Sequence, residues 1–205
     1  MTKKEIRAFT FEVRAEQDEK HGNILTGRPI VFNERTDLGW YDEIISADAL
    51  TDTDLRDVRF LVNHNTDMIP LARSRNNNEN STMQLSVDDQ GMVIRVDLDV
   101  ENNAEAKNLY SAVNRGDIDG MSFMFTVDRD TWDDPESDHP TRTIEALGKV
   151  FEVSAVTFPA YEQTSISARG LSEALESAKE SLESVKAEKR AIERQKQKIR
   201  ILSEV

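Results

Sequence analysis

The sequence predicts an α+β protein, in which a body of short strands and one helix is followed by a second, long helix. Three observations support this fold class. Runs of alternating apolar and polar residues, separated by turn residues, extend to about residue 167. Residues 103–116 interrupt them with apolar residues at helical spacing. From Leu171 onward a 4-3 spacing of apolar residues continues without Gly or Pro.

The first predicted strands lie in the N-terminal third of the chain. The run FTFEVRA at residues 9–15 alternates between apolar and polar side chains. The segment NILTGRPIVFNE carries Gly27 and Pro29, which indicate a bend before another apolar run. The segment DVRFLVNHN at residues 57–65 predicts a strand that places Phe60, Val62 and His64 on one face.

A hairpin and a helix are expected in the middle of the chain. The segment STMQLSVDDQGMVIRVDLDV consists of two alternating runs, joined by a turn in which Gly91 supplies a positive φ. The helix at residues 103–116 is expected to end at Gly116, a residue typical of a helix C-cap.

Two strong strands, GMSFMFTVD and KVFEVSAVTF, complete the predicted body. Pro159 follows the second strand, where a central strand has to end. The segment between them, DRDTWDDPESDHPTRT at residues 128–143, is acidic and contains proline, so we expect a mobile loop there.

The C-terminal segment forms a heptad seam that predicts one long, coiled-coil-like helix. We therefore divide the chain into a body at residues 1–169 and a charged heptad helix at residues 170–205. Lys189 and Lys196 interrupt the second half of the seam. The apolar seam residues are Leu171, Leu175, Ala178, Leu182, Val185, Ile192 and Ile199.

Composition excludes several classes of protein. The chain carries a net charge of -13. Residues 1–170 alone carry about -14 (18 Lys and Arg against 32 Asp and Glu) and the remaining residues about +1, so we expect no nucleic acid to bind the body. No apolar run approaches 18 residues, and the N-terminus has no apolar signal segment, so we expect no membrane span or secretion signal. The absence of cysteine excludes disulfides and favours an intracellular protein.

Three side chains are candidates for chemistry. Ser122 lies on the less apolar face of a strand rich in Met and Phe, where an ordinary mixed-face strand is the alternative interpretation. His64 ends an apolar strand, where a purely structural histidine is the alternative. Glu152 has apolar neighbours, and a buried carboxylate needs a partner. That partner could be a histidine or an arginine, and the available arginines are Arg59, Arg73 and Arg95.

Metal and cofactor sites are not expected. The acidic segment lacks the glycine and the final glutamate of a calcium-binding loop. Asp97 and Asp99 share a strand face, but no further ligand at a defined spacing completes a metal site. The chain has no glycine-rich phosphate loop and no G-x-S-x-G motif.

Taken in order, several segments between Phe9 and Arg169 resemble the prohead (procapsid) maturation proteases of tailed bacteriophages, which are similar in fold to the herpesvirus assemblins. The specific segments surround His64, Ser122 and Glu152. The segments that carry the resemblance are GRPIVFNE, YDEIISADAL, FLVNHN, DDQGMVIRVDL, NRGDIDGMSFMF and FEVSAVTFPAYEQTSISAR.

This resemblance implies a serine endopeptidase with a compact, mostly antiparallel β-barrel and flanking helices. It implies that Ser122 is the nucleophile, His64 the general base and Glu152 the third member, which orients His64. In the assemblins the third member is a second histidine, and neither His21 nor His139 lies where that would require. The implied substrates are scaffold protein, the scaffolding segment of the major capsid protein, and the protease itself, inside the procapsid in the host cytoplasm.

Two other functions remain open at this point. A catalytically inactive assembly or scaffolding module could retain the same barrel, and the helical, charged tail favours it to some degree. A general hydrolase of small esters would not explain the tail. For the tail we expect docking onto scaffold helices or a partner protomer, followed by trimming, and a homo-oligomer is compatible with the sequence.

Overall fold

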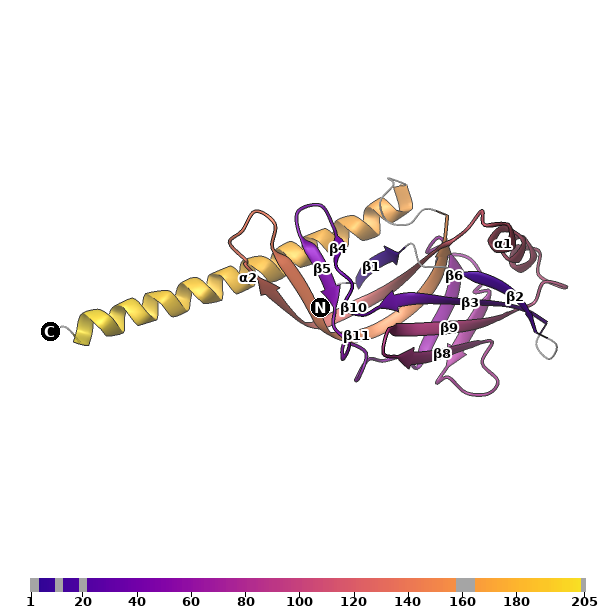
Figure 1. The fold of residues 1–205 in the computed structure, drawn as a ribbon, viewed down its shortest axis with the longest axis horizontal. Coiled ribbons are helices and arrows are strands. Elements are labelled where there is room, and N and C mark those ends of the chain that lie inside the picture. The colour runs from indigo at the N-terminus through magenta and orange to yellow at the C-terminus, as the bar shows by residue number, and fades with distance from the viewer. Residues whose placement is uncertain (1–3, 10–12, 19–21, 158–164, 204–205) are drawn as a thin grey trace.

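Strands make up most of the computed structural model, which describes residues 4–9, 13–18, 22–157 and 165–203 (Figure 1). Within these residues, eleven strands form two sheets, accompanied by two helices. The predicted α+β class is confirmed. Seven of the nine strand pairs are antiparallel, as expected, and the two parallel pairs both involve β11.

The larger sheet has seven strands and carries the candidate site. Its path is β1-β10-β11-β5-β4, and β6 pairs with β11 and with β7. The far edge of β11 is therefore shared by two short strands, β5 at its start and β6 at its end. The strands are β1 (Lys4–Phe9), β4 (Thr36–Asp37), β5 (Asp42–Ile45), β6 (Asp57–Val62), β7 (Ala72–Arg75), β10 (Gly120–Asp133) and β11 (Thr141–Val156).

The smaller sheet has four strands in the order β2-β3-β9-β8. The predicted bend in its second strand is a register irregularity between Gly27 and Ile30, which leaves the strand continuous. The strands are β2 (Arg14–Asp18), β3 (Gly22–Val31), β8 (Met83–Asp88) and β9 (Gly91–Leu98).

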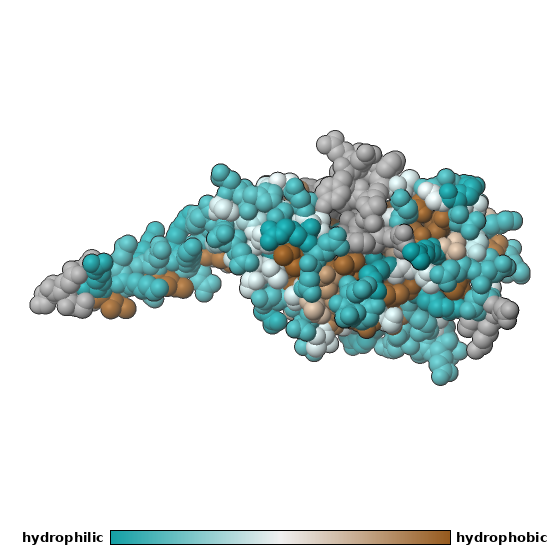
Figure 2. Space-filling model, in the orientation of Figure 1, coloured by the Kyte–Doolittle hydropathy of each residue, from teal (hydrophilic) through white to brown (hydrophobic). Residues whose placement is uncertain are grey.

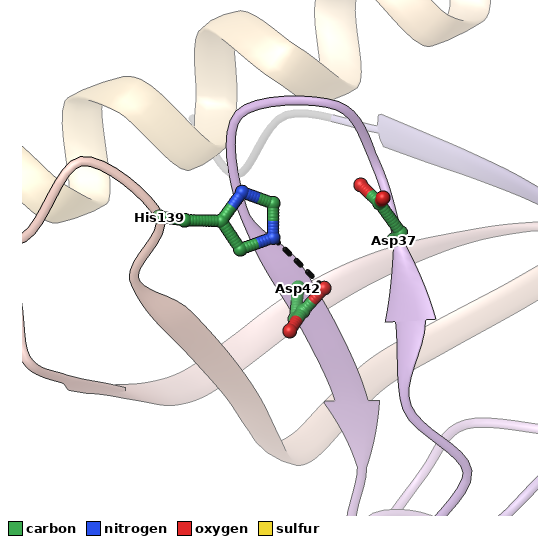
Figure 3. Close-up of side chains that lie close together, drawn as sticks. All are labelled: Asp37, Asp42 and His139. Carbon is green, nitrogen blue, oxygen red and sulfur yellow. Dashed lines mark hydrogen bonds and ion pairs between the residues drawn. The ribbon is translucent and has the colours of Figure 1, made fainter.

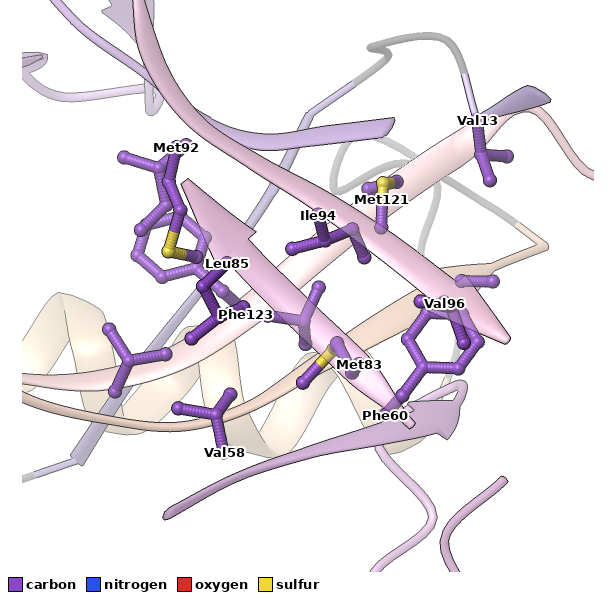
Figure 4. Close-up of a cluster of buried hydrophobic side chains, with 14 of the residues drawn as sticks. Val13, Val58, Phe60, Met83, Leu85, Met92, Ile94, Val96, Met121 and Phe123 are labelled. Atoms are coloured by element: carbon purple, nitrogen blue, oxygen red, sulfur yellow. The ribbon is translucent and has the colours of Figure 1, made fainter. Parts of the chain in front are cut away.

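The main hydrophobic core lies between the two sheets. Phe60 of β6 and Phe123 of β10 enter it from the larger sheet, and Met83 of β8 and Ile94 of β9 enter it from the smaller one (Figure 4). All four side chains are buried. Because each sheet buries one face in this core, apolar residues alternate with more polar ones along its strands, and this alternation predicted the strands.

The prediction of a closed barrel is not met. Over the described residues, the strand ladders form two separate sheets, and no ladder joins them. The strands of the two sheets face each other through apolar side chains, so the core is filled without closure of one sheet upon itself.

The predicted hairpin and helix are confirmed. Strands β8 and β9 pair around a turn in which Gly91 has φ of 144°, and a Cβ at this position would lie 2.0 Å from the carbonyl oxygen of Ile30. Helix α1 (Ala104–Arg115) is capped by the side chain of Asn103 and ends at Gly116, whose φ is 77°.

The acidic segment 128–143 differs from its prediction as a mobile loop. Most of it extends β10 and β11, and only residues 134–140 connect the two strands. Trp132 is buried against Trp40 and Tyr41, and the guanidinium of Arg142 is buried among carboxylates. These tertiary contacts outweigh the polar composition of the segment, which was the basis of the prediction.

Helix α2 (Ser165–Ser203) confirms that the tail is one long helix. The first half of its seam packs against the body, where Ala178 and Leu182 join a second apolar cluster with Tyr41 and Trp132. The second half projects from the body, with apolar residues along one side of a polar helix (Figure 2). A partner helix and the division of domains at residue 170 stay predictions.

Some predictions concern residues outside the described ranges. The predicted first strand, residues 9–15, corresponds to the end of β1 and the start of β2, and residues 10–12 between them lie outside. His21 and the segment 158–164 with Pro159 also lie outside. No helix among the described residues is both long and apolar enough to span a membrane.

Candidate active site

Strands β10 and β11 place Ser122 and Glu152 on one face of the larger sheet. Ser122 lies directly opposite Ser154, and Met124 lies directly opposite Glu152. Directly paired residues of an antiparallel ladder project to the same face, with Cβ atoms about 5 Å apart. The alternation sends Met121 into the core and leaves Ser122 on the opposite face of the strand, as predicted.

A tight turn after β6 brings His64 to Glu152. Strand β6 runs parallel to β11, with Arg59 opposite Glu152. His64 lies beyond the end of β6, with φ of 57°, so it does not continue the strand face of Phe60 as predicted. The turn instead places the imidazole Nδ1 atom 2.6 Å from Oε1 of Glu152.

The predicted need of Glu152 for a partner is therefore met by the histidine. The three arginines considered as alternatives pair elsewhere: Arg59 and Arg73 with Asp57, and Arg95 with Asp97 and Asp18.

The His64–Glu152 pair has the electronic arrangement of a general base. Both side chains are buried, with 6% and 3% of their surface exposed. An ionised carboxylate only accepts hydrogen bonds, so it holds the imidazole proton on Nδ1 and leaves a lone pair on Nε2. A nearby carboxylate also stabilises the imidazolium that forms when Nε2 takes a proton.

Ser154 also belongs to the site, and the sequence analysis did not assign it a role. Its hydroxyl donates to Oε2 of Glu152 over 2.5 Å and accepts from the main-chain N–H of His64 over 3.1 Å. Both oxygens of Glu152 are thus engaged, Oε1 by the imidazole of His64 and Oε2 by the hydroxyl of Ser154. The only signal in the sequence is that Ser154 follows Glu152 by two positions, which places both on one strand face.

The hydroxyl of Ser122 is buried and donates to the main-chain carbonyl of Arg7 over 2.7 Å. Arg7 lies on β1, which pairs with β10 so that Ala8 is opposite Ser122. A bond from Ser122 to His64 is not among the hydrogen bonds of the described residues. A change of rotamer about the Cα–Cβ bond changes the acceptor of a serine hydroxyl, and catalytic hydrogen bonds often tighten only when substrate is bound.

A buried ionic network surrounds the side chain of Arg7. The guanidinium of Arg7 bonds Glu5 and Glu43, and that of Arg142 bonds the same two carboxylates and Asp130. Burial by itself would lower the pKa of Arg7, but the charge of Glu43 and its other partners raise that pKa well above the ordinary value. The network fixes β1, and hence the carbonyl that holds Ser122, to β5 and β11.

A second titratable cluster joins Asp37, Asp42 and His139 at the surface (Figure 3). His139 Nε2 lies 3.0 Å from Asp42 Oδ1, and Arg35 donates to the other oxygen of Asp42 over 2.8 Å. These hydrogen bonds, that of His139 first, lower the pKa of Asp42. Three such side chains could hold a metal ion, but the carboxylate of Asp42 already has two partners, one of them the permanent cation Arg35. The cluster is therefore better explained as a structural link between the β10–β11 connection and β5 than as a metal site.

Comparisons with known proteins agree with the geometry. Residues 9–180 match the family described as Caudovirus prohead serine protease. The prohead protease of Enterobacteria phage HK97 is 28% identical over 171 residues, which cover 82% of this chain and 69% of that protein. No solved structure matches the chain. A family match over most of the chain, together with a buried histidine–carboxylate pair beside a strand serine, leads to one conclusion: the chain belongs to the prohead serine proteases of tailed phages.

Proposed function

We propose that this protease uses Ser122 as its nucleophile, His64 as its general base and Glu152 as the carboxylate that orients His64. The observation that carries the proposal is the 2.6 Å contact between His64 Nδ1 and Glu152 Oε1, on the strand face that also bears Ser122. The family match supports a serine as the attacking residue, and Ser122 and Ser154 are the buried serines on this face. Ser154 is engaged by both Glu152 and His64, whereas Ser122 bonds only a main-chain carbonyl, which supports Ser122 as the attacking residue.

The reaction is an acyl transfer in two halves. Nε2 of His64 takes the hydroxyl proton as Oγ of Ser122 bonds to the substrate carbonyl carbon. The same imidazolium then protonates the leaving amine, and the C–N bond breaks to give an ester on Ser122. Water, deprotonated by His64, attacks that ester and releases the acid, and the proton returns to Ser122.

Substrate binding must also release Ser122 from the carbonyl of Arg7. In the described state the hydroxyl proton points to an acceptor that cannot act as a base. Rotation of the hydroxyl toward His64 is therefore the first step of the reaction. This step needs no movement of β1, whose position is set by the buried ionic network.

We infer the substrates from the family. They are scaffold protein or the scaffolding segment of the major capsid protein, and the protease itself, inside the assembling procapsid in the host cytoplasm. The prohead proteases act in capsid maturation, and the acidic body of this chain makes nucleic acid an unfavourable partner.

Intact mass spectrometry of concentrated protein, alone and co-expressed with the cognate major capsid protein, tests this proposal. Wild type should produce discrete fragments, and Ser122→Ala should reduce the rate by about a million-fold, that is, to no detectable cleavage. Ser86→Ala, at an exposed strand serine, is the matched control and should cleave like wild type. Equal cleavage by wild type and Ser122→Ala would reject Ser122 as the nucleophile.

We further propose that the second half of α2 forms a coiled coil with a scaffold helix. Ile192 and Ile199 are 46% and 67% exposed and seven residues apart. Residues 186–203 carry 7 Lys and Arg against 2 Glu, which favours an acidic partner. A second copy is a poorer partner, because a parallel pair would place Lys189 and Lys196 against their own copies.

Truncation after residue 187 tests the docking role. This variant keeps Ala178 and Leu182, so its stability should equal that of wild type while its incorporation into procapsids is lost. Truncation at residue 170 would also uncover Tyr41 and Trp132 and is therefore less informative. Normal incorporation of the protein truncated after residue 187 would contradict the docking role.

A further inference from the structure

The turn that carries His64 has an unusual backbone. Asn63 and His64 have φ values of 51° and 57°, so two consecutive residues with side chains adopt the left-handed conformation. This conformation is unfavourable for most L-residues and persists only where the surrounding structure holds it. Asn and His both tolerate it better than most residues, but such residues normally occur singly, so two in succession need external support.

The end of β11 supplies this support through the main chain of the turn. The carbonyl of Ala155 accepts from the N–H of Asn63 over 2.9 Å. The hydroxyl of Ser154 accepts from the N–H of His64 over 3.1 Å. Each N–H in the strained part of the turn therefore has a partner on the strand that also carries Glu152.

The side chain of Asn63 forms a second connection to β11. Its Oδ1 accepts from the main-chain N–H of Thr157 over 2.9 Å, and its Nδ2 donates to Oγ1 of Thr157 over 3.0 Å. The two bonds fix the amide orientation of Asn63. They attach the turn to β11 just past the end of the strand.

We propose that Asn63, Ser154 and Thr157 are positioning residues that hold His64 in its catalytic orientation. Glu152 fixes only one atom of the imidazole ring, and a ring held at one atom can still swing about it. The contacts from β11 fix the main chain from which the ring projects. Ser154 links the two parts, because the same hydroxyl that receives the N–H of His64 also donates to Glu152. This inference rests on the proposed role of His64 as the general base.

The proposal predicts a loss of rate without a loss of fold. A misplacement of about 1 Å at a reacting group can reduce a rate about 100-fold. Ser154→Ala should have this effect, because it removes both contacts of the hydroxyl. Asn63→Gly should reduce the rate about tenfold, because glycine keeps the left-handed backbone and loses only the side-chain connection. Thr157→Val should have the smallest effect, because its main-chain N–H still reaches Asn63.

Labelling of the full-length protein with a fluorophosphonate probe, followed by intact mass, tests the prediction. Saturation kinetics separate the maximal labelling rate from the probe affinity. The maximal rate should fall in the order given, while the affinity stays near that of wild type. The melting temperature should fall only modestly, and most in Ser154→Ala, which leaves two buried polar groups without this partner. The far-downfield proton resonance of the His64 Nδ1–H, a signature of its bond to a carboxylate, should weaken or shift in Ser154→Ala.

One control variant and two contrary results make the outcomes distinct. Asn63→Asp keeps the acceptor for Thr157 and should retain more activity than Asn63→Gly. Wild-type labelling rates and an unchanged imidazole resonance in Ser154→Ala and Asn63→Gly would overturn the inference, as would a rate that falls only in proportion to melting temperature. The proposed function itself fails under a different result, namely labelling of wild type at a residue other than Ser122.

Discussion

Strands β10 and β11 bury polar groups at both ends, but the two ends differ in how these groups are balanced. At the Ser122 end, one carboxylate, Glu152, serves one imidazole and one hydroxyl. At the other end, the Arg142 guanidinium bonds Glu5, Glu43 and Asp130. The first arrangement is that of the proposed base, with the Nε2 lone pair of His64 left over, and the second gives each guanidinium and each carboxylate a partner of opposite charge. Burial thus supports the proposed reactivity in one case and a fixed architecture in the other.

Residue Arg7 belongs to both ends. Its side chain lies in the ionic network, and its carbonyl accepts the hydroxyl of Ser122. The ionic network at one end therefore fixes the position of the Arg7 carbonyl, which accepts the hydrogen bond of Ser122 at the other end. Variants at the two ends should separate accordingly, with activity lost at the first and stability lost at the second.

After Ser122→Ala, the largest effect is expected for Glu152→Gln. Ser154 needs an acceptor for its hydroxyl proton, so the new amide should present its oxygen to Ser154 and its NH₂ to Nδ1 of His64. That arrangement moves the imidazole proton to Nε2, which can then no longer accept a proton from Ser122. We expect a rate about ten-thousand-fold below wild type, measured as cleavage of the cognate capsid protein, with an unchanged melting temperature.

Glu145→Gln is the matched control for this variant. Glu145 lies on the same strand and pairs with Arg129 at the surface, where an ion pair contributes little. Its activity should equal that of wild type. A Glu152→Gln protein with more than about a tenth of wild-type activity would show that the carboxylate does not set the tautomer, against what mutations of such triads usually give.

The two ends also differ in how well the sequence predicted them. The placement of Ser122 and Glu152 could be predicted because both lie in alternating strands, where spacing alone assigns faces, and because the order of the segments resembles one family. Even there, the turn at Asn63 and the role of Ser154 were missed. Neither follows from strand periodicity, since one depends on left-handed backbone and the other on a bond between strands distant in sequence.

The Arg142 end could not be predicted from the sequence. Arg142 lies in a segment of acidic and turn-forming residues, which resembles a solvated loop when taken alone. Its partners Glu5 and Glu43 lie 137 and 99 positions away. No local pattern shows that separate charged residues meet in the interior. The apolar seam of α2 is a different case. Its period predicts a helix, but it does not show that the body covers the first half of that helix.

A second, smaller effect is expected for Arg142→Met, this time on stability. The substitution keeps much of the side-chain volume but leaves the buried carboxylates Glu5 and Glu43 with one cation fewer. Removal of one partner from a buried ion pair costs about 3–5 kcal/mol. Denaturant titration should show this loss, while the folded fraction still cleaves capsid protein. Arg129→Met, which breaks an exposed pair with Glu145, should cost less than about 1 kcal/mol.

The smallest effect is the pH dependence contributed by Glu5. Burial raises the pKa of Glu5, but the charges of Arg7 and Arg142 and its hydrogen bonds more than offset this, so its pKa lies below the ordinary value. Below about pH 4.3, the ordinary pKa of glutamate, the unfolded chain therefore binds a proton that folded Glu5 still rejects. The stability that this group contributes is complete above that pH and is lost as the pH falls toward its folded pKa.

Denaturant titrations of wild type and Glu5→Gln between pH 6 and pH 3 isolate this contribution. Asp42, Asp54, Asp57 and Asp88 also have lowered pKa values, so the whole protein should lose stability in acid, and only the difference between the two proteins reports Glu5. The free energy of unfolding should fall less steeply with acid in Glu5→Gln. Parallel curves would mean that the pKa of Glu5 is the same in the folded and the unfolded protein, so that its ion pairs add no net stability. The two ends of β10 and β11 would then differ less than their geometry indicates.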